Sequence, residues 1–305
     1  MTEGAAYAAT DTLAYLACAV PMVFGAVWFA VHRDDLGTWV TPEFPSARSG
    51  SGRGRPWAHP TRGIMKSRLR RSLSIIIPAY NEEQRLPATL LRVREYLAAS
   101  NWEFTEIVVV DDGSRDGTAA VAEASGVRVL RNPGNRGKGY SVRHGMLEAK
   151  GEWALFSDAD LSSPIEEVER LWGAAEREHA PVVIGSRAVD RSMVGVHQPF
   201  PREMIGRFFN LVMRAVTGLP FHDTQCGFKL FESAAAREIY KRQTLDGFGF
   251  DVEVLYIASH LGYRTLEVPV RWNDVAGTKV SMWLGAQGFL DPVRVRWNGV
   301  RGKYR

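Results

Sequence analysis

Short runs of apolar residues alternate with longer amphipathic segments through the middle of the chain. The runs are three to five residues long and rich in Val and Ile, and the segments between them have helical spacing. This alternation predicts an α/β fold with a mostly parallel sheet, because helices connect parallel strands. The expected strands are residues 73–77, 107–110, 127–130, 153–156 and 182–184, and the expected helices are 90–99, 118–124, 140–149 and 165–178.

A stretch without any charged side chain precedes this region. Residues 13–31 (LAYLACAVPMVFGAVWFAV) would span roughly 28 Å as a helix, close to the thickness of the hydrocarbon core of a bilayer. A signal peptide would need basic residues ahead of the run, but only Glu3 and Asp11 are charged there. A core helix would need a polar face, which the run lacks. We therefore predict a tail at residues 1–12 and one transmembrane helix at residues 13–31.

The segment after the predicted span is strongly basic. Residues 32–72 contain nine Lys and Arg, opposed only by Asp34, Asp35 and Glu43, and their central part is rich in Pro, Gly and Ser. By the positive-inside tendency, the rest of the chain is expected to be cytoplasmic, which makes the protein single-pass. We interpret residues 32–72 as a linker that either lies near anionic headgroups or is a solvated tether.

The C-terminal residues 281–305 combine aromatic and basic side chains. Trp283, Phe289 and Trp297 alternate with five Arg and Lys residues, which is typical of an amphipathic element on a membrane surface. Pro292 is expected to divide the element in two. An ordinary C-terminal helix packed on the core is the alternative.

Composition excludes several other classes of protein. The chain has 305 residues, a net charge of +4 and two cysteines, Cys18 and Cys226, so neither a disulfide framework nor a cysteine-based zinc site is expected. The basic excess lies near the ends of the chain and is not accompanied by an RNA-binding motif. Nucleic acid is therefore not an expected partner.

Acidic residues follow three of the predicted strands. Glu82 follows the first strand, Asp111 and Asp112 the second, and Asp158 and Asp160 the fourth. Ligands of parallel sheets bind at the carboxyl ends of the strands, so these carboxylates are expected to surround one crevice. Turn chemistry explains an Asp-Gly pair, but it explains less well why carboxylates follow three strands.

Two motifs within this set indicate a diphosphate and a metal. Asp158 and Asp160 are two residues apart, so in an extended segment their carboxylates share one side and can bind one Mg²⁺ or Mn²⁺ ion. Residues 134–139 (GNRGKG) match neither a Walker A loop nor a dinucleotide fingerprint. They would bring Lys138 and backbone amides to a diphosphate, unless they form only a capped loop.

The combined motifs resemble the inverting GT-A glycosyltransferases of family 2, and within that family the enzymes that glucosylate polyprenyl phosphates. The resemblance covers residues 73–279 and rests on the strings SIIIPAYNEE (74–83), VDDGS (110–114), NRGKG (135–139), DAD (158–160), GSR (185–187), DTQCGFK (223–229), GFDVE (249–253) and RWNDVAGTK (271–279). It implies a GT-A catalytic domain at residues 73–280. It also implies transfer of glucose from UDP-glucose to dolichyl or undecaprenyl phosphate with inversion, at a membrane.

The resemblance also implies roles for single residues. It assigns Asp223 to catalysis, and Asp158 and Asp160 to the metal, while Asp251 is a further candidate for catalysis from its place in the sequence. The expected nucleotide ligands are Pro78, Tyr80, Glu82, Asp111, Asp112, Lys138 and Asp158. Arg187, Arg191, Arg202 and Arg207 are candidates for the acceptor phosphate, because arginine binds phosphate in a bidentate manner.

Three points stay open at this stage. Asp223 is either a general base or a positioning group, since a polyprenyl phosphate is already largely a dianion at pH 7. Asp251 either orders a substrate or interacts with a helix dipole. GDP-mannose and UDP-GlcNAc are alternative donors, and a nucleotide-sugar binding protein without catalysis is a less favoured class. A dehydrogenase is disfavoured because the dinucleotide fingerprint is missing.

Overall fold

The computed structural model describes residues 71–196, 200–275 and 290–305. Within these residues, no helix is both long and apolar enough to cross a membrane. The predicted tail at residues 1–12, the predicted span at 13–31 and the linker up to residue 70 lie outside the described residues.

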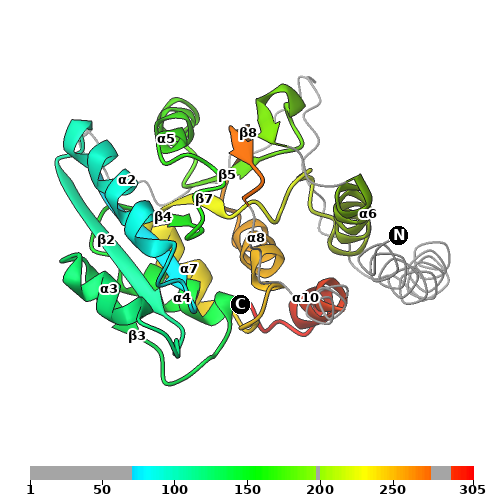
Figure 1. Cartoon of the computed structure of the whole chain (residues 1–305). Coiled ribbons are helices and arrows are strands. Elements are labelled where there is room, and N and C mark those ends of the chain that lie inside the picture. Colours follow the sequence, from blue (N-terminus) through cyan, green and yellow to red (C-terminus); the bar gives the residue numbers. More distant parts are fainter. Residues whose placement is uncertain (1–70, 197–199, 276–289) are drawn as a thin grey trace, which may run out of the picture.

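The described residues form an α/β fold built on a seven-stranded sheet (Figure 1). The strand order is β3-β2-β1-β4-β7-β5-β8, and every neighbouring pair is parallel except those made by β7. This confirms the predicted fold class and all five predicted strands. The strands are β1 (Ser72–Ala79), β2 (Phe104–Asp111), β3 (Arg128–Arg131), β4 (Trp153–Ser157), β5 (Val182–Ser186), β7 (Phe228–Glu232) and β8 (Thr265–Pro269), and a separate pair joins β6 (Val194–Val196) to β9 (Trp272–Asn273).

The apolar pattern does not predict strands β6, β7, β8 and β9, and of these β7 lies in the middle of the main sheet. It is antiparallel to β4 and β5, and Lys229 interrupts its hydrophobic sequence. Its first residue, Phe228, pairs with Ser157 at the carboxyl end of β4. The loop that leads into β7 therefore enters at the same edge of the sheet as the loops that leave β1, β2 and β4.

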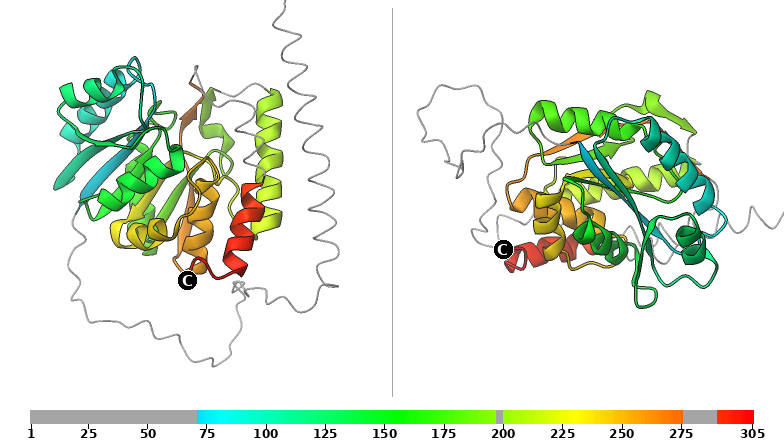
Figure 2. Two further views of the ribbon diagram at one scale, coloured as in Figure 1. Left: turned by 90° about the horizontal axis from the view of Figure 1, so that it is seen from below. Right: turned by 90° about the vertical axis from the view of Figure 1, so that its left-hand side faces the viewer.

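Helices cover both faces of the sheet. Alternate strand residues contribute to two separate cores, with Ile75 and Val109 packed under α2, α3 and α5, and Ile76 and Val108 packed under α4, α7 and α8. Helices α6 and α10 lie side by side beyond α8 (Figure 2). The helices are α2 (Leu86–Ala99), α3 (Thr118–Ala124), α4 (Lys138–Glu148), α5 (Glu167–Glu178), α6 (Phe200–Thr217), α7 (Ser233–Arg242), α8 (Phe250–His260) and α10 (Asp291–Val300), with a short 3₁₀ turn at Arg191–Met193.

The described end of the C-terminal segment belongs to the folded domain. Helix α10 packs against α6 and α8, and Val295 and Tyr304 are fully buried in the core below α4 and α8. Pro292 stands in the first turn of α10, so it begins this helix and does not divide it. Residues 290–305 therefore pack on the core of the domain, and the expected boundary at residue 280 lies outside the described residues, as do residues 281–289.

The other end of the domain is fixed by Arg71, the last residue before β1. Its guanidinium lies over the rings of Trp102 and Trp172, with its central carbon 5.1 and 4.1 Å from their centroids, and it forms a 2.6 Å ion pair with Glu169. Cation–π contacts of this kind add stability when they are shielded from water. The predicted linker thus joins the domain at the amino end of β1, opposite the edge where the acidic loops gather.

Candidate active site

Asp158 lies at the carboxyl end of β4, between the glycine-rich loop and the loop before β7. Its carboxylate forms a 2.6 Å ion pair with Lys138 Nζ, and its backbone N–H donates to the carbonyl of Gly227 at 3.1 Å. The carboxylate packs so closely on Gly227 that a Cβ there would lie 1.9 Å from Asp158 Oδ2. The position of Asp158 therefore depends on a glycine 69 residues further along the chain.

Lys138 brings a positive charge to this carboxylate from the start of α4. Burial would lower the pKa of Lys138, but Asp158 and Asp251 outweigh that effect and raise it, with a smaller contribution from Asp160. Its ammonium also lies over the ring of Phe156, 5.3 Å from the centroid. Lys138 is thus held as a cation at the sheet edge where the sequence predicts a diphosphate.

The two aspartates after β4 suit a divalent cation. Asp158 already holds one cation, the Lys138 ammonium, and Asp160 accepts the backbone N–H of Ser162 through one oxygen at 2.9 Å. Among the described residues, no group of three or more His, Cys, Asp or Glu side chains gathers to bind a metal. Two carboxylates are enough for Mg²⁺ or Mn²⁺ when substrate phosphates and water complete the coordination, so these residues fit such a metal.

The loops after β1 and β2 are joined to each other by hydrogen bonds. Asn81, with a positive φ of 54°, accepts the N–H of Arg115 through its side chain, and its own N–H donates to Ser114 Oγ. Glu83 accepts the N–H of Gly117 at 2.6 Å, and the N–H of Glu82 donates to Thr118 Oγ1 at 2.7 Å. This bracing holds the half-buried residues Pro78, Tyr80 and Glu82 at one end of the sheet.

Asp112 is buried and holds the glycine-rich loop in place. One oxygen accepts the amide of Asn132 at 2.8 Å and the N–H of Arg136 at 3.0 Å, and the other accepts the N–H of Gly137 at 2.8 Å. Asp111 is also buried and accepts the N–H of Ser114. The structure therefore brings both predicted nucleotide ligands to the expected edge, where they order the loops on either side.

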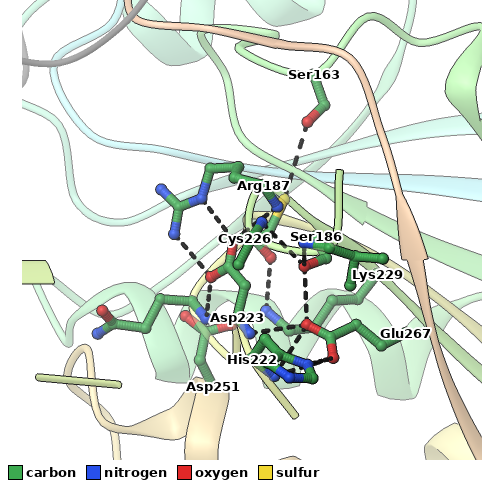
Figure 3. A network of polar contacts seen from close by, with 12 residues as sticks. Ser163, Ser186, Arg187, His222, Asp223, Cys226, Lys229, Asp251 and Glu267 are labelled. Atoms are coloured by element: carbon green, nitrogen blue, oxygen red, sulfur yellow. Dashed lines mark hydrogen bonds and ion pairs between the residues drawn. The ribbon is translucent and has the colours of Figure 1, made fainter. Parts of the chain in front are cut away.

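The buried Asp223 forms an ion pair with the half-buried Arg187 at the same edge (Figure 3). Arg187 Nε and Nη2 donate to the two carboxylate oxygens at 2.6 and 2.8 Å, and the backbone N–H of Arg187 donates at 3.0 Å. Burial would raise the pKa of Asp223, but Arg187 outweighs that effect and holds it below its usual range. Asp223 is therefore held as a carboxylate.

Asp251 pairs with Lys229 beneath the site. Lys229 is fully buried in β7, and its ammonium donates to Asp251 in the first turn of α8 and to the carbonyl of Cys226 at 2.7 Å. Burial raises the pKa of Asp251 above its usual value, against the lowering effect of Lys229 and Lys138. This position makes Asp251 a partner of buried cations and gives it little exposure to a substrate.

Of the predicted phosphate-binding arginines whose side chains the structure describes, Arg187 is found in this network. Arg187 commits two of its nitrogens to Asp223, whereas Arg191 lies in the exposed turn before β6. Arg202 and Arg207 are on α6, and their side chains lie outside the described part of the chain.

Several residues at the site were not singled out from the sequence. Lys229 belongs to a string that the resemblance quotes, but nothing in the string indicates an ion pair with Asp251. Asn132 begins the loop after β3, and its amide joins Asp112 to Ser141. Glu267 in β8 accepts the backbone N–H of Asp223 at 2.8 Å. No local motif marks these residues, because their partners come from distant elements.

Comparison with known proteins accounts for this arrangement. A family model described as Glycosyl transferase family 2 matches residues 74–240. The chain is 39% identical over 245 residues to the dolichyl-phosphate beta-glucosyltransferase of Drosophila melanogaster, covering 74% of this chain and 75% of that protein. It is 34% identical over 254 residues to the Homo sapiens protein of the same name, covering 77% of this chain and 78% of that protein.

Solved structures share the fold at lower identity. Glucosyl-3-phosphoglycerate synthase of Mycobacterium tuberculosis, in complex with Mn²⁺, UDP-glucose and phosphoglyceric acid, has a TM-score of 0.55 at 21% identity, covering 81% of this chain and 86% of that chain. Mannosyl-3-phosphoglycerate synthase of Rubrobacter xylanophilus has a TM-score of 0.56 at 18% identity, covering 76% and 74%. These likenesses confirm a GT-A-like fold. The family model and the curated relatives together establish that the chain belongs to glycosyltransferase family 2 and is a glycosyltransferase.

Proposed function

We propose that the chain transfers glucose from UDP-glucose to dolichyl phosphate or a related polyprenyl phosphate, with release of UDP and inversion at the anomeric carbon. The names of the curated relatives support this acceptor and this sugar. One observation carries the proposal: two cation–carboxylate pairs, Lys138–Asp158 and Arg187–Asp223, stand at the same edge of the sheet. The first pair suits the diphosphate of a donor, and the second suits the phosphate of an acceptor.

Binding of the donor is assigned to the braced loops and to the start of α4. Pro78, Tyr80 and Glu82 would contact the uridine, with Asp111 and Asp112 ordering the surrounding loops. Lys138 would approach the diphosphate, because an ammonium beside the leaving group stabilises the charge that develops on it. Asp158 and Asp160 would hold Mg²⁺ or Mn²⁺, which supplies further neutralisation of that charge when bound.

Asp223 is assigned a positioning role. A phosphate monoester has a second pKa near 6, so the acceptor is largely a dianion at neutral pH and needs little deprotonation. Arg187 keeps Asp223 ionised, and the carboxylate in turn fixes the guanidinium. Arg187 then presents its remaining nitrogen, Nη1, toward the acceptor phosphate, while a phosphate oxygen attacks the sugar. The buried Lys229, paired with Asp251 beneath the site, would offset part of the negative charge there.

Contact with a membrane completes the proposal, because the acceptor has a lipid tail. Leu290, Val293, Trp297 and Val300 are all about half exposed and recur along one face of α10. Its neighbour α6 exposes Met204 and Leu211. We assign these faces to the bilayer surface, residues 13–31 to a single span, and the catalytic domain to the cytoplasm. Because the linker joins the domain at the edge far from the site, it needs enough length to pass along the domain.

A donor panel tests the proposed function. The full-length protein in detergent is incubated with dolichyl phosphate, Mn²⁺ or Mg²⁺, and radiolabelled UDP-glucose, UDP-GlcNAc or GDP-mannose. We expect a glucose-labelled lipid from UDP-glucose and at least tenfold less product from the other two donors. More lipid product from GDP-mannose or UDP-GlcNAc than from UDP-glucose would overturn the assignment of the sugar. Binding of UDP-glucose without any product, in the presence of metal and acceptor, would favour a nucleotide-sugar binding protein.

A further inference from the structure

We propose that Glu267 in β8 is a positioning residue that holds the side chains of Asp223 and Arg187 in the places that the transfer requires. This inference rests on the proposed function, because it takes the Arg187–Asp223 pair to be the place where the acceptor phosphate is held. Glu267 lies 44 residues from Asp223 in sequence and 80 from Arg187. Figure 3 shows its carboxylate directed at the loop that carries His222 and Asp223.

The Glu267 carboxylate binds backbone N–H groups in the loop before β7, which has no regular secondary structure to hold it. Residues 218–227 form neither helix nor strand. The backbone N–H groups of His222 and Asp223 both donate to Glu267, His222 at 2.9 Å to Oε2 and Asp223 at 2.8 Å to Oε1. Adjacent N–H groups bound to one carboxylate fix the direction of the peptide and therefore the starting point of the Asp223 side chain.

The same carboxylate also holds the strand end that carries Arg187. The hydroxyl of Ser186 donates to Glu267 Oε1 at 2.8 Å, and the same Oγ accepts the N–H groups of Ala188 and Val189. Glu267 therefore connects the backbone on both sides of the ion pair. A shift of its carboxylate would move the guanidinium and the Asp223 carboxylate together.

The burial and the charge of Glu267 make its hydrogen bonds to this loop necessary for the stability of the carboxylate. Only 10% of the Glu267 side chain is exposed, and its one ionisable partner among the described residues is His222, whose Nδ1 lies 3.1 Å from Oε2. A nearly buried carboxylate is costly unless hydrogen-bond donors surround it. Here three neutral donors, two backbone N–H groups and one hydroxyl, provide that stabilisation, so the group is suited to precise placement of the loop.

The variant Glu267→Gln tests the proposal. An amide keeps the size of the side chain, but its NH₂ group would meet one of the donors that the carboxylate accepts. We expect kcat to fall about tenfold or more, because small misplacements at a reacting centre are expensive. The KM for UDP-glucose should stay within about twofold, since the donor loops are on other strands. Ser186→Ala, which removes one donor without adding an opposed one, should lower kcat in the same direction by a smaller factor.

Glu106→Gln is a matched control at the opposite edge of the sheet. Glu106 is similarly buried, with 12% of its side chain exposed, and it also accepts one backbone N–H and one serine hydroxyl. Equal losses of kcat in Glu106→Gln and Glu267→Gln, each in proportion to the fall in melting temperature, would overturn the positioning role. So would a Glu267→Gln variant with kcat within twofold of the wild type. The comparison of these variants requires a wild-type protein that transfers glucose. A wild-type protein without that activity would refute the proposed function itself.

A double-mutant cycle separates positioning from folding. In an Asp223→Asn background, Glu267→Gln should lower the residual rate by less than about twofold, because the group that it positions has already lost its charge. A purely structural role would reduce the rate by the same factor in both backgrounds, which would contradict the proposal.

Discussion

Gly227→Ala is expected to displace the carboxylate of Asp158 without otherwise altering the fold. A methyl group at residue 227 would lie 1.9 Å from Asp158 Oδ2, whereas nonbonded carbon and oxygen atoms need roughly 3 Å. The carboxylate must therefore move by about 1 Å. The glycine has an ordinary negative φ, so the backbone itself tolerates alanine. The substitution thus acts on one side chain, the one assigned to the metal and to Lys138.

A displacement of that size predicts a large loss of activity. Misplacement of a reacting or metal-binding group by about 1 Å costs on the order of 10²-fold in rate. We expect kcat/KM for UDP-glucose to fall by about that factor, and the concentration of Mn²⁺ that gives half-maximal activity to rise. The measurement is a Mn²⁺ titration of glucose transfer to dolichyl phosphate, together with the melting temperature of each protein.

Gly173→Ala is the matched control, because it also adds one methyl group to a glycine with negative φ. Residue 173 lies in α5 away from the site, and its Cβ would meet only the flexible end of Arg177 at 3.3 Å. This variant should keep full activity and gain stability from the helix propensity of alanine. A Gly227→Ala protein that retains more than half of the wild-type kcat/KM at the same Mn²⁺ requirement would refute the assigned role of Asp158.

Three further substitutions test other parts of the account. Asp158→Asn should nearly abolish turnover while the melting temperature stays close to that of the wild type, and near-normal activity after treatment with EDTA would contradict the metal assignment. Asp223→Asn should lower kcat but leave the shape of the pH–rate profile above pH 7 unchanged. The pKa of Asp223 is already lowered, so its carboxylate stays ionised from about pH 6 to 9 and loses its ion pair only in strong acid; strong rescue at high pH would instead identify a general base. Trp297→Ser should weaken transfer to long-chain dolichyl phosphate without changing the melting temperature, because this side chain is about half exposed. An equal loss with a short, water-soluble acceptor would refute its assignment to the membrane.

The apolar pattern predicted five of the parallel strands of the sheet, β1 to β5, but not β8, which pairs in parallel with β5. Strands such as β1 and β4 are buried on both faces, so they appear as continuous apolar runs, and their carboxyl ends carry the acidic loops. Strand β7 could not be found in this way, because Lys229 stands inside it and forms its ion pair with Asp251 from α8. A charged residue interrupts an apolar run, and the sequence does not show which distant residue pairs with it in the folded protein.

The sequence predicted the part of the site that lies at strand ends, and it missed the part that depends on tertiary structure. Asp112 and Asp158 follow strands and Lys138 opens a helix, so the order of the strands brings these three together, whereas Asp223 lies in the loop before β7. Glu267 appears in sequence as an ordinary polar residue in a partly buried strand, and its role depends on a loop that β7 delivers to the edge. Likewise, the aromatic and basic residues of the C-terminal segment gave no indication that Val295 and Tyr304 are fully buried. Amphipathic patterning does not distinguish a helix on a membrane from a helix on a core.

The product of the reaction tests the central claim most directly. Full-length protein, UDP-glucose labelled with ¹³C at the anomeric carbon, dolichyl phosphate and Mn²⁺ are incubated, and the lipid product is examined by NMR. We expect dolichyl phosphate glucose with a β anomeric carbon bonded through phosphate, and no such product when Asp158→Asn replaces the wild type. An α-linked product, a labelled product with no lipid, or equal product from Asp158→Asn would contradict the central claim.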